Sequence, residues 1–303
     1  MDDEGFTVTK LPAIELLAST QWGDYELLDS GNGLKLERFG NYRFVRPEHQ
    51  ALWQPALSQR EWENAEAVFQ ATNEESGGTW QFKRPIEPRW EMKYKTLSFY
   101  ARTSNSRHLG VFPEQAPHWE WIRRQVVSAH RSIQVLNLFG YTGLASLAAA
   151  QAGARVTHVD ASKKSIQHAR ENQALSGLDE KPIRWIVDDA IKIVKRESRR
   201  NVRYDGIILD PPKFGRGPKG EVWEFNKMLP YLLEEVRPVL ASQPLFLVIT
   251  AYAIRASALA LHYAIQEMMG DFNGILSCGE LVIPEKSAGR ILSMAITARW
   301  SAT

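Results

Sequence analysis

The fold is decided by one stretch of the sequence, Val135-Leu136-Asn137-Leu138-Phe139-Gly140-Tyr141-Thr142-Gly143. Its first half is rich in apolar residues, as is typical of a strand that is covered on both faces. Its second half holds two glycines, which allow a tight turn and let a ligand approach the backbone. A helix-length segment, Leu144–Gln151, follows. Strand, glycine turn and helix in this order predict the first unit of a parallel α/β sheet.

The same alternation continues towards the C-terminus. Apolar runs predict five parallel strands, at 133–139, 155–160, 183–188, 204–210 and 245–250. Helices fit the segments 114–129, 144–151, 162–176, 190–200, 222–240 and 256–269. Two further strands, 274–283 and 290–300, are separated by a short break and should form an antiparallel hairpin. The sequence therefore predicts an α/β fold with a seven-stranded, mostly parallel sheet.

The residues before this region have a different pattern. Tyr25–Pro47 reads as a small antiparallel meander with turns at 30–33 and 40–41. A short helix is expected within 53–69, a loop at 74–78, and extended segments at 80–84 and 93–100. We place the domain boundary near residue 112, which predicts a small β-rich substrate-recognition domain over 1–112 and a cofactor-binding domain over 113–303.

Composition limits the class of protein. The 303 residues are 44% hydrophobic and 24% charged, which is typical of a globular chain and excludes wholesale disorder. The longest apolar run is too short for a membrane helix. The start, Met1-Asp2-Asp3-Glu4, is acidic where a signal peptide would be basic, and Cys278 has no partner for a disulfide. We therefore expect a cytoplasmic protein that does not enter a membrane.

Acidic residues follow the predicted strands. In an open parallel sheet the ligand binds at the carboxyl ends of the strands, and these ends carry Asp160, Asp188-Asp189 and Asp210. Asp160 lies about 20 residues beyond the glycine turn, where a carboxylate can accept both hydroxyls of a ribose. Each aspartate has a second interpretation, because Asp160, Asp188 or Asp189 could instead cap the helix that follows.

The glycine turn does not suit a dinucleotide. A pyrophosphate needs bare backbone amides at the start of the helix, and here Tyr141 and Leu144 occupy such places. A cofactor without phosphates fits better. S-adenosylmethionine, which consists of adenine, ribose and a sulfonium amino acid, is the cofactor that these residues favour.

Together these motifs resemble the class I, Rossmann-like S-adenosylmethionine-dependent methyltransferases, and more narrowly the bacterial 23S ribosomal RNA large-subunit methyltransferase family. The resemblance covers about residues 108–300 and depends on five segments. They are Gly110-Val111-Phe112-Pro113-Glu114-Gln115, the stretch 135–143, Val159-Asp160-Ala161-Ser162 with Asn172, Val187-Asp188-Asp189-Ala190, and Asp210-Pro211-Pro212-Lys213-Phe214. Glu114 stands where the family has Asp, and the N-terminal part matches poorly.

The resemblance implies roles for these residues. Phe139 to Gly143 would cradle the methionine part of the cofactor, Asp160 would bind the ribose, and Asp189, helped by Asp188, would read the adenine amino group. The implied cofactor-binding set is Phe112, Gln115, Asn137, Phe139, Gly140, Tyr141, Thr142, Gly143, Asp160, Ala161, Ser162, Asp188, Asp189 and Ala190. No metal is expected.

Asp210 and the prolines after it are implied to form the substrate side. In related enzymes the acidic side chain and the carbonyl of the first proline accept hydrogen bonds from a planar target nitrogen, and rigid prolines keep that carbonyl aimed. The candidate catalytic residues are Asp210, Pro211, Lys213 and Phe214. Lys213 stands directly after the prolines, where a base-stacking aromatic is expected. Alternatively, the prolines only end the strand.

The acceptor is predicted to be a nitrogen. Family members that methylate cytosine C5 need a cysteine nucleophile, usually just after the fifth strand. This chain has Thr250-Ala251-Tyr252 there, and Cys278 lies in a late strand, where it should be a small buried apolar residue. Catalysis should then be mainly alignment of a ring or exocyclic nitrogen with the sulfonium methyl group.

Two basic segments are relevant to the identity of the macromolecule that the protein binds. Residues 81–107 carry seven Lys or Arg against two acidic residues, interleaved with aromatics, which is a mixture suited to single-stranded RNA. These aromatics could equally be the core of the small domain. The basic cluster at 192–203 is interpreted as a solvated helix end.

The leading prediction is a methyltransferase for structured, ribosomal RNA. The alternatives are a protein or small-molecule methyltransferase, or a non-catalytic cofactor- or RNA-binding module. The sequence predicts no oligomeric state.

Overall fold

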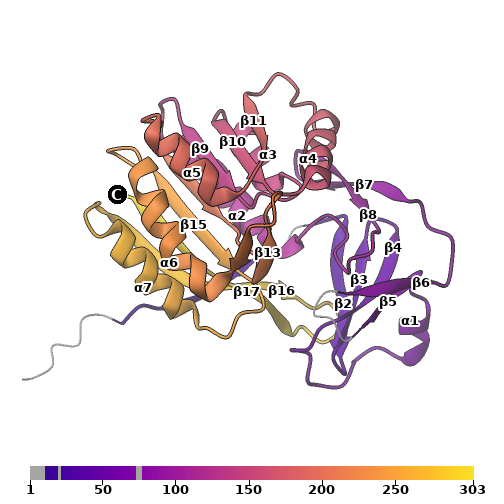
Figure 1. Ribbon diagram of the computed structural model, residues 1–303. Coiled ribbons are helices and arrows are strands. Elements are labelled where there is room, and N and C mark those ends of the chain that lie inside the picture. The colour runs from indigo at the N-terminus through magenta and orange to yellow at the C-terminus, as the bar shows by residue number, and fades with distance from the viewer. Residues whose placement is uncertain (1–10, 20–21, 73–76) are drawn as a thin grey trace, which may run out of the picture.

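The computed structural model describes residues 11–19, 22–72 and 77–303, which form two lobes (Figure 1). The larger lobe is built on an eight-stranded sheet and the smaller on a five-stranded sheet. None of the helices in these residues has the length and apolarity that a membrane crossing requires.

The large sheet has the strand order β11-β10-β9-β12-β15-β17-β16-β1. The five strands predicted to be parallel are parallel: β9 (Gln134–Leu138), β10 (Arg155–Asp160), β11 (Ile183–Val187), β12 (Gly206–Leu209) and β15 (Phe246–Ala251). The closing hairpin of β16 (Gly274–Pro284) and β17 (Ile291–Ala302) is antiparallel, as predicted. An eighth strand, β1 (Ile14–Ala18), pairs parallel with β16 and was not predicted.

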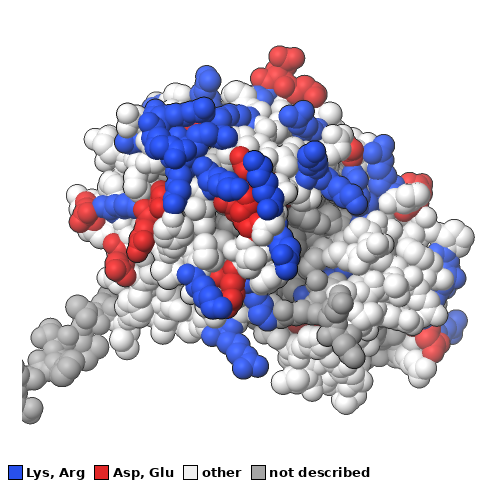
Figure 2. Space-filling model, in the orientation of Figure 1, with Lys and Arg blue, Asp and Glu red and all other residues white. Residues whose placement is uncertain are grey.

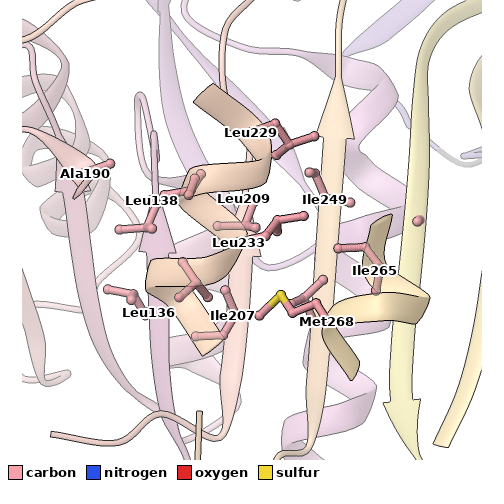
Figure 3. Close-up of a cluster of buried hydrophobic side chains, with 14 of the residues drawn as sticks. Leu136, Leu138, Ala190, Ile207, Leu209, Leu229, Leu233, Ile249, Ile265 and Met268 are labelled. Carbon is pink, nitrogen blue, oxygen red and sulfur yellow. The ribbon is translucent and has the colours of Figure 1, made fainter. Parts of the chain in front are cut away.

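Helices cover both faces of this sheet (Figure 1). One face carries α5 (Ala190–Arg199), α6 (Phe225–Val236) and α7 (Ala258–Met269); the other carries α2 (Ala116–Ser128), α3 (Leu144–Gln151) and α4 (Lys163–Leu175). Leu136 and Leu138 of β9 point to the α5–α7 side, where they join a buried apolar cluster (Figure 3). Because side chains alternate along a strand, Asn137 points to the α2–α3 side.

The small lobe begins with the predicted meander, β2 (Tyr25–Gly31), β3 (Leu34–Phe39) and β4 (Tyr42–Pro47). The helix expected within 53–69 is reduced to α1 (Gln59–Glu63). The segment Ala67–Ala71 is instead β5, because it pairs with both β4 and β6 (Gly78–Phe82). The loop expected at 74–78 lies mostly outside the described residues.

A second hairpin, β7 (Arg89–Tyr94) and β8 (Leu97–Arg102), links the two lobes. The backbone N–H of Tyr100 donates to Oδ1 of Asn172 on α4 (2.9 Å), and Nδ2 of Asn172 donates to the carbonyl of Thr142 in the glycine turn (3.0 Å). The small lobe is thus connected through one buried asparagine to the predicted ligand loop. The division into domains at residue 112 stays a prediction.

Most aromatic residues of the 81–107 segment belong to the core of the small lobe. Trp90, Tyr94 and Phe99 are buried there. Four of its cations form ion pairs: Arg89 and Arg102 pair with Glu171 of α4, and other pairs join Arg84 to Glu66 and Lys95 to Glu120. For these three rings, the alternative that they form the core of the small domain therefore holds.

A small hairpin leaves the large lobe just after Asp210. It consists of β13 (Phe214–Arg216) and β14 (Val222–Glu224), which lie between β12 and α6. The helix predicted to start at Val222 begins at Phe225 instead and continues into the short 3-10 helix η2 (Arg237–Val239). The residues 222–224 are extended because they pair with β13.

Candidate active site

The turn after β9 has an unusual backbone. Phe139 and Tyr141 have positive φ angles of 59° and 49°, and Gly143 has a φ of 87°. Residues other than glycine rarely adopt this conformation, and such local strain concentrates at functional sites. The strained turn is held to the neighbouring strand by a hydrogen bond from the N–H of Gly140 to the carbonyl of Val159 (3.0 Å).

Asp160, at the end of β10, fixes the same turn from the side. Its Oδ2 accepts the backbone N–H of Tyr141 (2.9 Å), and its Oδ1 accepts that of Ser162 (2.8 Å). Burial raises the pKa of Asp160 above its ordinary value, although these two hydrogen bonds oppose the shift. Each carboxylate oxygen has a second lone pair, so the bonds orient Asp160 without exhausting its capacity to accept hydroxyls.

A buried polar chain lies beneath the turn. Nδ2 of Asn137 donates to Oγ of Ser146 (2.9 Å), and that Oγ lies 2.9 Å from Nδ1 of His158. Burial lowers the pKa of His158 to about 3, so this imidazole is neutral at physiological pH. Oδ1 of Asn137 is buried and has no hydrogen-bond partner among the described residues. It is an unused acceptor of a side chain that lines the pocket described next.

A pocket opens at the carboxyl ends of β9, β12 and β15, next to α2. Its walls come from segments far apart in the sequence. The predicted site residues that line it are Phe112, Gln115, Asn137, Phe139, Gly140, Tyr141, Thr142, Gly143 and Asp210. The fold thus brings the 110–115 loop, the glycine turn and the end of the fourth parallel strand to one cavity.

Asp210 is the acidic group of this pocket. Nε2 of Gln115 donates to its Oδ2 (3.1 Å) and to the hydroxyl of Tyr252 (3.0 Å), so one amide positions two side chains. Burial, together with the nearby carboxyl groups of Glu114 and Asp160, raises the pKa of Asp210 to about 8. No Lys or Arg of the described residues forms an ion pair with it. A half-buried carboxyl group without a cation favours a positively charged ligand.

The two prolines after Asp210 differ in their surroundings. Pro211 is buried, whereas Pro212 is exposed and its carbonyl accepts the indole N–H of Trp223 (2.6 Å). Trp223 therefore holds the Pro212 peptide in place. Lys213 and Phe214 are exposed and do not line the pocket.

The adenine-side candidates lie one strand further along the sheet edge and do not line this pocket. Oδ1 of Asp189 caps α5 by accepting the N–H of Lys192 (3.0 Å), and Asp188 pairs with Arg196 at 3.7 Å. Ser162 caps α4 in the same manner, through the N–H of Ser165 (3.2 Å). The capping interpretation thus holds for Asp189, whereas α4 is capped by Ser162 and not by Asp160. A cofactor role stays a prediction for Asp160, Ala161, Ser162, Asp188, Asp189 and Ala190.

Sequence reasoning missed Tyr252. Its ring centroid lies 5.2 Å from that of Phe112, its hydroxyl is bonded to Gln115, and it directly follows β15. The rule that ligands meet the carboxyl ends of parallel strands, applied to the fifth strand as to the others, would have pointed to it. Unlike Tyr252, Thr250 of β15 and His118 of α2 line the pocket itself, and the sequence pattern gives no signal for them.

Comparison with known proteins supports a methyltransferase. A family model described as S-adenosylmethionine-dependent methyltransferase matches residues 54–264. A crystal structure of an S-adenosylmethionine-dependent methyltransferase from Agrobacterium tumefaciens is 50% identical, with a TM-score of 0.91, and the match covers 97% of this chain and 96% of that one. SMU.776, solved in complex with S-adenosylhomocysteine, shares the fold at 17% identity, with a TM-score of 0.69 and coverage of 91% and 75%.

Curated relatives match over shorter segments. The ribosomal RNA large subunit methyltransferase I of Aeromonas salmonicida (strain A449) is 40% identical over 93 residues, which are 30% of this chain and 24% of the relative. The ribosomal RNA large subunit methyltransferase K/L of Shewanella baltica (strain OS155) is 33% identical over 167 residues, which are 52% and 22% of the two chains. The matches thus span less than a quarter of these relatives' length.

The chain belongs to the S-adenosylmethionine-dependent methyltransferase family. It is an enzyme of the class I methyltransferase fold, and its cofactor is S-adenosylmethionine. The pocket fits that cofactor, because among the described residues Oδ1 of Asn137 has no hydrogen-bond partner and Asp210 has no cationic one, which suits a ligand that carries a sulfonium and an ammonium group.

The role proposed for Asp160 predicts a loss of cofactor affinity in Asp160→Ala. A hydrogen bond to a charged group contributes about 1.5–3 kcal/mol, so the dissociation constant for S-adenosylhomocysteine should rise by about ten- to 150-fold. Calorimetry measures this, with exposed Asp179→Ala as the matched control. Unchanged affinity in Asp160→Ala would exclude the ribose role.

The raised pKa of Asp210 predicts a pH-dependent preference between cofactor and product. Below about pH 8 the carboxyl is mostly protonated and neutral; above it, the carboxylate attracts the sulfonium of S-adenosylmethionine but not the neutral thioether of S-adenosylhomocysteine. The affinity ratio in favour of S-adenosylmethionine should therefore grow with pH, by up to about tenfold per unit below pH 8. Calorimetry across this range should show that Asp210→Asn abolishes the trend, and a flat ratio in the wild type would contradict it.

Proposed function

We propose that the protein transfers a methyl group from S-adenosylmethionine to a nitrogen of a base in structured ribosomal RNA. The observation that carries this is the position of Asp210: it lines the pocket, has no cationic partner within the part of the chain that the structure describes, and is followed by two prolines, one buried and one anchored. The names of the curated relatives support RNA, and specifically ribosomal RNA, as the substrate.

In this proposal the protein promotes methyl transfer by positioning the target amine relative to the methyl group. The target amine donates to a carboxyl oxygen of Asp210 and to the carbonyl of Pro211, since the carbonyl of Pro212 is occupied by Trp223. Gln115 keeps Oδ2 of Asp210 in place, which leaves Oδ1 for the amine. When bound, S-adenosylmethionine supplies an electrophilic methyl group. Asp210, in its carboxylate form, would accept the proton that the target nitrogen loses on methylation; where Asp210 is already protonated, that proton would pass to water.

The remaining site assignments belong to the same proposal. The turn from Phe139 to Gly143 holds the methionine part, Asp160 the ribose, and Asp188 and Asp189 the adenine. Residues 1–112 act in substrate recognition and 113–303 in catalysis, and the protein works in the cytoplasm, where ribosomal RNA is assembled into ribosomes.

Cys278 supports a nitrogen rather than a ring carbon as the acceptor. This cysteine is buried in β16, its Sγ lies 3.7 Å from the carbonyl of Ala13, and it does not line the pocket. Burial raises the pKa of its thiol, which disfavours the thiolate that attack on a pyrimidine ring requires. Cysteine catalysis is therefore not part of the proposal.

The experiment is transfer of a labelled methyl group in vitro. Total RNA, protein extract and small metabolites from cells that lack the gene are offered separately to the purified enzyme. Label should enter RNA and should be recovered in an N-methylated nucleoside after digestion. Label in protein or in small molecules alone would refute the RNA substrate and favour the corresponding alternative, whereas a 5-methylpyrimidine product would refute the nitrogen acceptor.

A further inference from the structure

The hairpin β13–β14 has two faces of different character. In its register Phe214 is opposite Glu224, Gly215 opposite Trp223, and Arg216 opposite Val222. Paired residues share a face of an antiparallel pair, and successive residues alternate. One face therefore carries Gly215 with Trp223. The other carries Phe214, Arg216, Val222 and Glu224.

The inner face is anchored to the active site. Trp223 is buried, its ring centroid lies 4.9 Å from that of Phe139 in the glycine turn, and its indole N–H is bonded to Pro212. The N–H of Phe225 donates to the carbonyl of Lys213 (2.9 Å) and closes the base of the hairpin. The hairpin is thus held in a defined place relative to the pocket.

The outer face is exposed and apolar at its centre. Phe214 is 54% exposed and Val222 is 53% exposed. Neither residue lines the pocket that contains Asp210. Phe214 follows Asp210 by four residues, so the two Cα atoms are at most about 14 Å apart. Because the Phe214 ring lies near the pocket but outside it, the ring can contact a group next to the methylated base, but not that base itself.

The charges around this face favour an anion. The two carboxylates of the hairpin are neutralised from neighbouring helices, since Glu221 pairs with Lys192 of α5 and Glu224 pairs with Lys227 of α6. Arg216 and Lys219 are exposed, and the described residues show no ion pair for either. Figure 2 shows Lys and Arg side chains gathered over α5 and continuing towards the middle of the molecule, where Figure 1 places the hairpin.

We infer that the outer face of β13–β14 binds the single-stranded RNA next to the methylated nucleotide. A base next to the target stacks on Phe214, and the neighbouring backbone phosphates contact Arg216 and Lys219. Proteins bind single-stranded nucleic acids with this combination of an aromatic platform and cations. The inference rests on the proposed function and adds a binding site to it. It moves the main RNA contact from the 81–107 segment, whose rings are largely buried, to the hairpin.

The test is binding of a short fluorescein-labelled single-stranded RNA of mixed sequence, measured by anisotropy with the full chain and S-adenosylhomocysteine present. Phe214→Ala should raise the dissociation constant about tenfold, because stacking contributes about that factor or more per base. Phe214→Trp should restore binding. Arg216→Glu should also weaken binding and should lower the slope of log affinity against log salt by about one or more.

Controls separate this inference from the proposed function. Tyr263→Ala removes an equally exposed ring (55%) from α7 and should change nothing. Unaltered S-adenosylhomocysteine affinity in Phe214→Ala shows that the pocket is intact. If the wild type binds the RNA and Phe214→Ala binds it as tightly, the hairpin site is wrong while the proposed function stands. Equal affinity for a duplex of the same sequence would likewise exclude stacking. If the wild type neither binds nor methylates RNA, both fail.

Discussion

Asp210→Ala is expected to lower the rate of methyl transfer by at least about a hundredfold while leaving a folded, cofactor-binding protein. The variant removes the group that accepts the target amine, and a misplacement of reacting atoms by about one ångström is enough for a loss of this size. It should not destabilise the fold, because the raised pKa shows that the native structure disfavours the ionised carboxyl. Single-turnover transfer to RNA measures the rate, and calorimetry measures S-adenosylhomocysteine binding.

Cys278→Ser provides the contrasting variant and should retain activity. Since Cys278 is buried in β16 and away from the pocket, a hydroxyl there can affect stability but not the chemical step. The nitrogen mechanism would be overturned if Asp210→Ala were active and Cys278→Ser were not. The nitrogen mechanism would also be overturned if the wild type formed a covalent adduct with RNA that contains 5-fluorocytosine and Cys278→Ser did not.

Gly140→Ala is expected to abolish measurable cofactor binding and to destabilise the fold by about 1–3 kcal/mol. A Cβ at this position would lie 2.3 Å from Cε1 and 2.6 Å from Nδ1 of His158. That ring cannot move aside easily, because it is fully buried and bonded to Ser146. The glycine turn must therefore shift, together with the peptide of Tyr141 that Asp160 holds. Denaturant unfolding and calorimetry give the two measurements.

Gly23→Ala is the matched control for that variant. A Cβ at Gly23 meets no atom within 4 Å, so this substitution should alter neither stability nor affinity by much. Wild-type affinity in Gly140→Ala would show that the turn does not contact the cofactor.

The large sheet was predictable because its strands are continuous apolar runs. Strands β9, β10, β12 and β15 are largely buried, and even the half-buried edge strand β11 is mostly apolar, which leaves a strong local signal. Strand β1 carries no such signal, since Ile14 and Leu16 are exposed and its partner, β16, is more than 250 residues away. The first three residues of β5, 67–69, were misassigned to a helical segment for the related reason that pairing with β4 and β6, rather than local propensity, sets their conformation.

The candidate site was predictable where a motif sits on a strand end. Asn137, the 139–143 turn and Asp210 meet in one pocket as expected. The residues that interact with these groups were not predictable. Tyr252 accepts a hydrogen bond from Gln115, and the buried Glu114 raises the pKa of Asp210; the fold alone brings these residues close together. The two faces of β13–β14 were hidden for another reason. A helix was predicted from Val222, and the period of two that turns Trp223 inward and Phe214 outward applies only to a strand.

The central claim, N-methylation of ribosomal RNA, is tested most directly by nucleoside mass spectrometry of ribosomal RNA from cells with and without the gene. We predict that one N-methylated nucleoside is lost from the deletion strain, that it returns with the wild-type gene, and that it does not return with Asp210→Ala. An identical set of methylated nucleosides in both strains, or the loss of a 5-methylpyrimidine instead, would contradict the claim.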